Sequence, residues 1–176
     1  MTRLVAFGAG DDVRPLVTIA HSLGWHTTVI DRRSRLASES RFPDADQPIA
    51  TDWQAAVGQV TFTPRTAVVL MTHSLPDDVE ILPLIASAPV GYLGSLGPAH
   101  RRQWLLDLVP PEIAMRLNDD FRSPIGLNLG DRSAAGIAVA VVAEILAQLN
   151  DRDATSFSDV AMGSVNTARP MESIDA

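Results

Sequence analysis

The sequence contains no cysteine. This absence excludes disulfides, thiolate metal sites, iron–sulfur clusters and cysteine nucleophiles within the chain, and it agrees with a reducing compartment. Positive charge is also scarce, since 14 Lys and Arg residues face 21 Asp and Glu residues, for a formal net charge of −7. Nucleic-acid-binding surfaces need an excess of cationic side chains. The sequence therefore predicts a cytoplasmic protein that does not bind nucleic acid.

Long apolar runs are absent as well. The longest apolar-rich stretch, 137–149, contains Glu144 and Gln148, and it is shorter than the roughly 20 residues that cross a bilayer. The N-terminal residues lead directly into an apolar run, without a charged-then-apolar signal sequence. We expect no membrane association. Apolar residues nevertheless make up 46% of the 176 residues, which is enough for a compact globular core.

Short apolar runs alternate with longer segments of helical periodicity, the pattern of βαβ units. The sequence predicts an α/β fold, a Rossmann-like three-layer sandwich with a mostly parallel sheet. The expected strands are 4–7, 27–30, 48–50, 67–71, 90–93 and 124–129, and the expected helices are 12–23, 53–58, 76–86, 98–108 and 134–149. Residues 1–149 form the predicted domain. Residues 150–176, rich in Asp, Ser, Thr, Gly and Pro, are expected to form a flexible or loosely docked tail.

A glycine turn follows the first expected strand. Gly8 would permit the tight turn, and Gly10 would let a pyrophosphate approach the backbone at the helix N-terminus. Asp31 ends the second expected strand, where an acid accepts hydrogen bonds from ribose hydroxyls. Together these residues predict a dinucleotide site for NAD(P). The alternative is that the glycines serve chain geometry alone.

Two departures from the dinucleotide pattern weigh against that ligand. Val13 stands where a third glycine is usual, which predicts a looser helix–strand contact. Asp11 and Asp12 lie at the anion-binding end of the helix, where we expect them to cap free amides and to repel a pyrophosphate.

Two arginines directly follow Asp31. Arg32 and Arg33 would either favour a 2′-phosphate or form a solvated surface pair, and Asp31 itself argues against the phosphate.

Further candidate ligand contacts follow other strands. Thr72 and His73 come after the run 67–71, and Gly94 opens an expected turn over 94–97. The carboxyl ends of parallel strands share one edge, so we expect these residues to line it. His73 is the candidate proton carrier, with loop hydrogen bonding as its alternative role.

The charged residues of the following helices have simpler expected roles. Arg101 or Arg102 would either grip a phosphate or remain solvated. Asp77 and Asp78 are expected to be N-terminal charges of their helix, and Glu144 is expected at the solvent edge of the last helix.

Six stretches of the chain together resemble one known family, the XdhC/CoxI proteins, which are accessory factors for xanthine dehydrogenase and related molybdenum hydroxylases. The stretches are FGAGDDVRPLVTIAHSLGW (7–25), VIDRR (29–33), RFPDAD (41–46), TAVVLMTHS (66–74), YLGSLGPAHRR (92–102) and SPIGLNLGDRSAAGIAVAVVAEIL (123–146). They occur in the family's order and cover nearly the whole chain apart from the tail. The resemblance is to the family's C-terminal, Rossmann-like domain.

This resemblance implies an accessory or maturation factor that assists the supply of molybdenum cofactor to a xanthine dehydrogenase-type hydroxylase. The implied ligand is NAD(P) or a nucleotide form of the molybdenum cofactor, and the residues expected to contact it are Gly8, Gly10, Asp31, Thr72, His73 and Gly94. Family members usually carry an N-terminal domain with a cysteine tied to cofactor handling. The implied partners are therefore hydroxylase subunits or a separate domain of that N-terminal type.

Two other functions remain open. One is a small NAD(P)-dependent oxidoreductase that uses His73 as its acid–base residue, although hydride transfer also requires a substrate-binding region. The other is an interaction scaffold without a small-molecule ligand, which includes association between copies of this chain.

Overall fold

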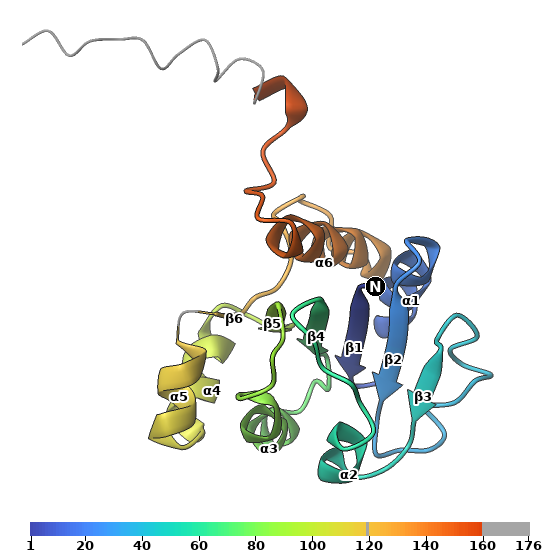
Figure 1. The fold of residues 1–176 in the computed structure, drawn as a ribbon, viewed down its shortest axis with the longest axis vertical. Helices are drawn as coiled ribbons and strands as arrows, with labels where there is room; N and C mark the ends of the chain where they lie inside the picture. Colours follow the sequence, from blue (N-terminus) through green and yellow to red (C-terminus); the bar gives the residue numbers. More distant parts are fainter. Residues whose placement is uncertain (119, 160–176) are drawn as a thin grey trace, which may run out of the picture.

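The computed structural model describes residues 1–118 and 120–159, which form a six-stranded sheet flanked by helices (Figure 1). The strands are β1 (Arg3–Phe7), β2 (His26–Ile30), β3 (Gln47–Ile49), β4 (Thr66–Leu70), β5 (Tyr92–Ser95) and β6 (Phe121–Arg122). The helices are α1 (Val13–Ser22), α2 (Trp53–Val57), α3 (Leu75–Ile85), α4 (His100–Leu108), α5 (Pro111–Leu117) and α6 (Ala134–Leu149). Every strand pair is parallel, in the order β3-β2-β1-β4-β5-β6.

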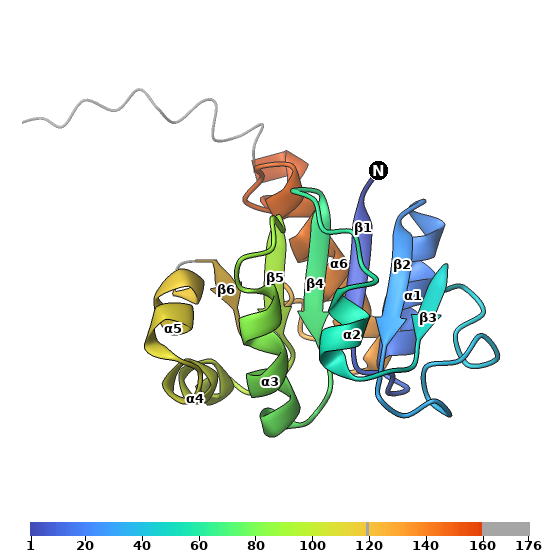
Figure 2. The same ribbon diagram turned by 60° about the horizontal axis from the view of Figure 1, so that its bottom comes forward.

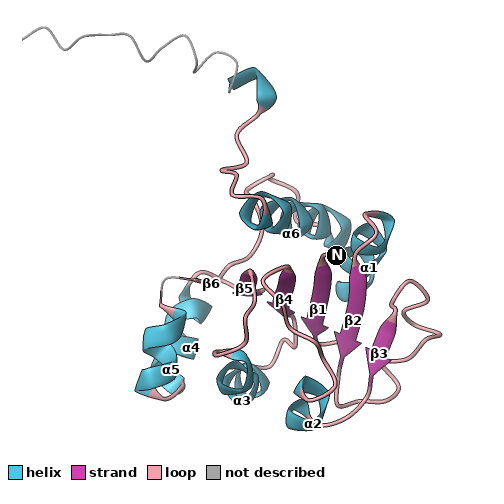
Figure 3. Ribbon diagram, in the orientation of Figure 1, coloured by secondary structure: helices cyan, strands magenta, loops and turns pink. Residues whose placement is uncertain are grey.

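Helices cover both faces of the sheet. Figure 3 shows α1 and α6 on one side of the strands and α2 to α5 on the other. Alternation along β1 explains both layers, because Leu4 and Ala6 pack into the core under α1 and α6, whereas Val5 and Phe7 pack into the opposite core. The structure confirms the predicted three-layer Rossmann-like sandwich.

The last helix is anchored to the sheet by the partly buried carboxylate of Glu144. Tyr92 Oη donates to Glu144 Oε2 at 2.5 Å, and the backbone N–H of Gly126 donates to the same oxygen at 2.8 Å. Burial, followed by the bond to Glu144, raises the pKa of the Tyr92 hydroxyl far above its ordinary value, so the hydroxyl keeps its proton and donates. The prediction that Glu144 lies at the solvent edge is wrong, because its side chain is only 14% exposed.

The region before α6 differs from the expected pattern. The strand expected over 124–129 is wrong: the strand is β6, which ends at Arg122. The Gly126 N–H donates to Glu144 instead of a neighbouring strand, and Gly126 has a φ of +98°, outside strand geometry. Helix α5 was not predicted. It begins at Pro111, directly after Pro110, and such a pair resembles a helix breaker although proline is well tolerated at the first helical position.

Beyond α6, the described residues of the tail, 150–159, are exposed. The rest of the predicted tail, 160–176, lies outside the described residues. Within 1–118 and 120–159, no helix combines the length and the apolar character needed to cross a membrane.

The anchoring role of Glu144 gives a stability prediction. Glu144→Ala leaves the buried Tyr92 hydroxyl and Gly126 N–H without their acceptor, and we expect a loss of about 2–4 kcal/mol in the free energy of unfolding. Urea unfolding measures this loss. The control is Glu112→Ala on exposed α5, which should change stability by less than about 0.5 kcal/mol. Equal effects of the two substitutions would contradict the anchoring role.

Candidate functional site at the carboxyl edge of the sheet

The strand order reverses between β1 and β4. From β1 the chain builds β2 and β3 on one side, and it then crosses over to build β4, β5 and β6 on the other. Figure 2 shows the carboxyl ends of the strands together at one end of the sheet. In open α/β sheets, ligands bind outside this edge at the point of reversal. The connections from β1 to α1 and from β4 to α3 meet there.

The glycine turn is in close backbone contact with the end of β4. Gly8 has a φ of +105°, and a Cβ at this residue would lie 2.2 Å from the carbonyl oxygen of Met71. Its N–H donates to the carbonyl of Ile30 at 2.7 Å, so Gly8 bridges the extensions of β2 and β4. Only glycine meets both requirements. The geometric role predicted for Gly8 is thus satisfied without any ligand.

The two acids after the turn are engaged in pairs across the edge. Asp11 Oδ1 accepts from Arg41 at 2.8 Å, and Asp12 Oδ2 lies 2.7 Å from His73 Nε2. Asp12 is the N-cap residue of α1, but its side chain makes no capping hydrogen bond, so the predicted capping role is wrong. Asp12 Oδ1 would lie 2.5 Å from a Cβ on Gly10, which places negative charge directly beside the turn.

Backbone donors nevertheless remain available at the turn. Among the described residues, no acceptor pairs with the backbone N–H groups of Gly10, Asp11 or Asp12. Unpaired amides at the start of a ten-residue helix favour a negatively charged ligand group. Val13, at the third glycine position of the dinucleotide pattern, is fully buried in the core beneath α1.

Asp31 lies where the sequence predicts, but its oxygens are already occupied. Oδ2 accepts from the Ala9 N–H at 3.0 Å and from Arg33 Nη2 at 2.8 Å, while Oδ1 accepts from the Arg33 backbone N–H and from Nε. Asp31 is 2% exposed. Burial alone would raise the pKa of its carboxyl, but the hydrogen bonds and charge of Arg33 and the Ala9 N–H outweigh burial and lower the pKa.

Thr72 and His73 form the β4 side of the site. Thr72 Oγ1 donates to Asp78 Oδ1 at 2.5 Å, which directs the hydroxyl proton away from solvent. His73 has a φ of +57°, an uncommon conformation for a residue other than glycine. Its bond to Asp12 supplies the partner that the sequence did not reveal, and it orients an imidazole that remains 58% exposed. A catalytic role for His73 stays a prediction.

Asp78 is the central polar residue of the site, and the sequence does not predict this role. It is fully buried, and it accepts from Thr72 Oγ1, from Ser95 Oγ at 3.3 Å and from Arg101 Nη2 at 2.7 Å. It is therefore more than an N-terminal charge of α3, because it links the ends of β4 and β5 to α4. Arg101 is held by this carboxylate and is not solvated. Arg102 donates to backbone carbonyls of Asn118 and Phe121.

Gly94 occupies a different position from the one predicted. Strand β5 extends to Ser95, so Gly94 lies inside the strand, and the expected turn over 94–97 begins two residues later. A Cβ on Gly94 would lie 2.3 Å from Cγ2 of Ile125. The absence of a side chain at this residue therefore permits close packing of the segment after β6.

The structure brings together five of the six predicted contact residues: Gly8, Gly10, Asp31, Thr72 and His73. A cavity of about 230 Å³ opens next to them on the α2 and α3 side. It is lined by Asp31, Arg32, Arg33, Trp53, Thr72 and Asp77. Within residues 1–118 and 120–159, no three His, Asp or Glu side chains are grouped to hold a metal ion.

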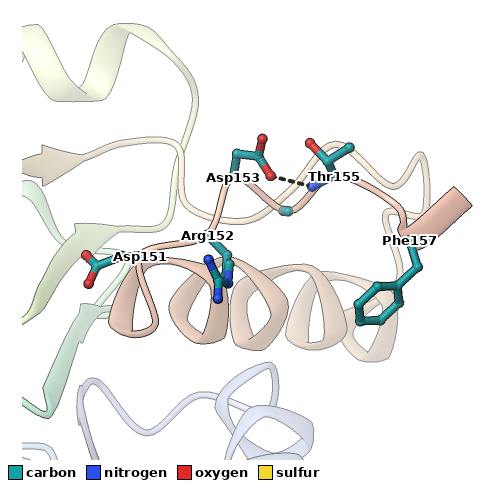
Figure 4. A pocket seen from close by; sticks show the side chains of 6 residues that line it. Asp151, Arg152, Asp153, Thr155 and Phe157 are labelled. Carbon is teal, nitrogen blue, oxygen red and sulfur yellow. Dashed lines mark hydrogen bonds between the residues drawn. The ribbon is translucent and has the colours of Figure 1, made fainter. Parts of the chain in front are cut away.

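A larger cavity of about 730 Å³ lies beside the tail (Figure 4), and Figure 2 shows the start of the tail at the end of the sheet opposite the carboxyl edge. It is lined by residues 151–155 and Phe157 of the exposed tail, and Phe157 is 94% exposed. Arg65 Nη1 donates to the carbonyl of Leu149 at 2.6 Å, which places the start of this tail beside the amino end of β4. This cavity is remote from the glycine turn and is formed by one short segment, so we do not assign the site to it.

The low pKa of Asp31 makes its contribution to stability pH-dependent. Asp31→Asn should reduce the free energy of unfolding by about 1–3 kcal/mol near neutral pH, because the charged acceptor of four N–H groups is lost. Since the charged form stabilises the fold above the ordinary value of 3.8, this difference should shrink as the pH falls through the lower folded-state pKa. Urea unfolding between about pH 2 and about pH 7 measures it.

Asp107→Asn, on the exposed surface of α4, is the control for Asp31→Asn. A difference between wild type and Asp31→Asn that stays constant down to the lowest pH would contradict the charged Asp31–Arg33 pair.

Comparison with known proteins places this chain in a family. The XdhC Rossmann domain model matches residues 4–145. A Bacillus subtilis protein described as a probable xanthine dehydrogenase subunit is 37% identical over 144 residues, which are 82% of this chain and 42% of that protein. The uncharacterised Escherichia coli protein YqeB is 29% identical over 151 residues, covering 85% of this chain and 28% of YqeB.

A solved structure agrees with the sequence matches. The crystal structure of a Bacillus halodurans protein described as a xanthine dehydrogenase has a TM-score of 0.73 and 34% identity, and the match covers 90% of this chain and 46% of that one. The chain thus spans less than half the length of these relatives. The chain belongs to the XdhC family, and residues 4–145 are its Rossmann domain.

Proposed function

We propose that this chain serves as an accessory component of a xanthine dehydrogenase-type molybdenum hydroxylase and assists the supply of its molybdenum cofactor. In this proposal the Rossmann domain binds a nucleotide-bearing ligand at the carboxyl edge of the sheet. The observation that carries the ligand class is the group of unpaired backbone N–H donors of Gly10, Asp11 and Asp12. They lie at the same edge of the sheet as the cavity on the α2 and α3 side. The family and the names of its relatives support the hydroxylase system.

In this proposal, different domains bind different parts of the cofactor. The chain has no cysteine and hence no thiolate to offer a metal centre. We therefore assign to it the phosphate or nucleotide portion of the cargo, and we assign the metal-bearing portion to a partner. That partner is one of the hydroxylase subunits or a separate domain of the kind that the longer relatives have room for, since the chain covers 42% and 46% of two of them.

Electrostatics limit how such a ligand enters. The turn offers unpaired backbone N–H groups to a phosphate, but Asp12 Oδ1 lies close to Gly10 and would repel it. The bond to His73 holds the other oxygen of Asp12 toward the β4 side. The ligand must therefore bind with the Asp12–His73 pair in place or displace it, and affinity should depend on the charge of Asp12.

Calorimetric titration tests nucleotide binding directly. The ligands are NAD⁺, NADP⁺ and a nucleotide form of the molybdenum cofactor, and we expect saturable binding of at least one. Asp12→Asn should tighten binding by about 3–5-fold, because a like charge beside the phosphate is removed. Asp11→Asn is the comparison variant and should have a smaller effect, since Asp11 is 83% exposed and its charge is paired with Arg41. Binding that is weakened by Asp12→Asn would contradict this placement of the phosphate.

An interaction scaffold without a ligand is the second candidate, and the carboxylate of Asp12 beside the turn favours it. Co-purification with hydroxylase subunits separates the two functions when combined with the titrations. A chain that co-purifies with the hydroxylase but binds none of the three nucleotides is a scaffold, and this result would refute the ligand-binding role.

A further inference from the structure

We propose that Arg33 makes the cavity on the α2 and α3 side selective between nucleotides. The preferred nucleotide carries an additional phosphate, of the 2′-phosphoadenosine type, and its counterpart without that phosphate binds more weakly. The inference rests on the proposed nucleotide-binding function and specifies the ligand class. It follows from the hydrogen-bond donors and acceptors that line the cavity.

The acidic residue that would bind ribose hydroxyls has no free acceptor. Both oxygens of Asp31 accept two N–H bonds each, from Ala9 and from three nitrogens of Arg33. The side chain of Asp31 is 3% exposed, so a ligand cannot reach it while Arg33 is in place. A ribose placed here would find no acceptor on Asp31 for its hydroxyl protons.

Arg33 presents a donor in place of that acceptor. Its Nε and Nη2 bind the Asp31 carboxylate side-on at 2.8 Å, which fixes the plane of the guanidinium. Its Nη1 has no hydrogen-bond partner in the part of the chain that the structure describes, and the side chain is 64% exposed. A guanidinium that is fixed on one side and open on the other recognises a phosphate with little loss of side-chain entropy.

The other polar groups of the cavity are also mostly donors. Trp53 is 2% exposed, and its indole N–H is buried without an acceptor among the described residues. The guanidinium of Arg32 lies 5.0 Å from the centre of the Trp53 ring. The nearby acids Asp77 and Glu80 are both paired with Arg32, and the charge of Asp77 also acts on Arg33. The open donor of Arg33 favours a ligand group rich in acceptors.

From the sequence, the negative charge of Asp31 is expected to disfavour a 2′-phosphate. The pairing of Asp31 with Arg33 leads us to propose the opposite preference. The negative charge of Asp31 is covered by Arg33 and serves to position it. The cavity of about 230 Å³ is smaller than the roughly 300–1,000 Å³ of whole-ligand pockets, so it accommodates one end of a longer ligand that continues toward the glycine turn.

Two probes that differ by one phosphate test the selectivity. Adenosine 2′,5′-bisphosphate and 5′-AMP are titrated into the full chain by calorimetry at equal ionic strength, with inorganic phosphate as a third probe. We expect the bisphosphate to bind at least about tenfold more tightly than 5′-AMP. Inorganic phosphate should bind more weakly than either. Arg33→Ala should abolish this preference, because it removes the donor and exposes Asp31.

Two further variants keep the test interpretable. Arg35→Ala changes an exposed arginine of the same loop and should leave the preference unchanged. Arg33→Lys keeps the charge without the side-on fork, and it should retain only part of the preference, which guards against a folding defect in Arg33→Ala. Circular dichroism checks that each variant is folded.

The outcomes separate this inference from the function beneath it. Equal affinity for the bisphosphate and 5′-AMP, or a preference that survives Arg33→Ala, would overturn the role of Arg33 and leave nucleotide binding intact. Inorganic phosphate that binds as tightly as the bisphosphate would overturn the nucleotide class. Failure of all three probes would count against the proposed function itself.

Discussion

The close contact between the glycine turn and the end of β4 is the constraint on which the site depends. Gly8 adopts a positive φ and leaves no room for a side chain against the Met71 carbonyl, so the first and fourth strands are locked together at their carboxyl ends. This contact places the start of α1 beside Thr72 and His73, which lie about sixty residues later in the chain. The N-terminal amides, the β4 loop and the end of β2 then share one edge because the sheet leaves them no other position.

The acids at and beside this edge act mainly by positioning basic or hydroxyl groups. Asp31 fixes Arg33, Asp12 fixes His73, and Asp78 fixes Arg101 together with the ends of β4 and β5. Each of these carboxylates is paired, so the net charge of −7 does not describe the local surface that a ligand meets. The open donors are the backbone N–H groups at the turn and Arg33 Nη1, while the second oxygen of Asp12 leaves negative charge beside the turn. An acidic protein can therefore present hydrogen-bond donors along one edge.

The sequence predicted most of the architecture because the strands of a parallel sheet are buried on both faces and appear as short apolar runs, as 67–71 does. It also placed Gly8 and Asp31 correctly, since their positions follow from one local βα unit. It failed where the partner comes from a distant element. Neither the burial of Asp78 under Arg101 nor that of Glu144 under Tyr92 has a local signal. The helix after Pro110 was missed because proline marks both breaks and helix starts.

Binding of a nucleotide at the carboxyl edge between β1 and β4 can be tested by NMR, with backbone amide resonances followed during titration with NADP⁺. We expect the largest shifts at Gly10, Asp11 and Asp12 and at Arg33, with little change in residues 151–157 of the tail. Shifts confined to the tail, or saturation with no change at the glycine turn, would contradict it.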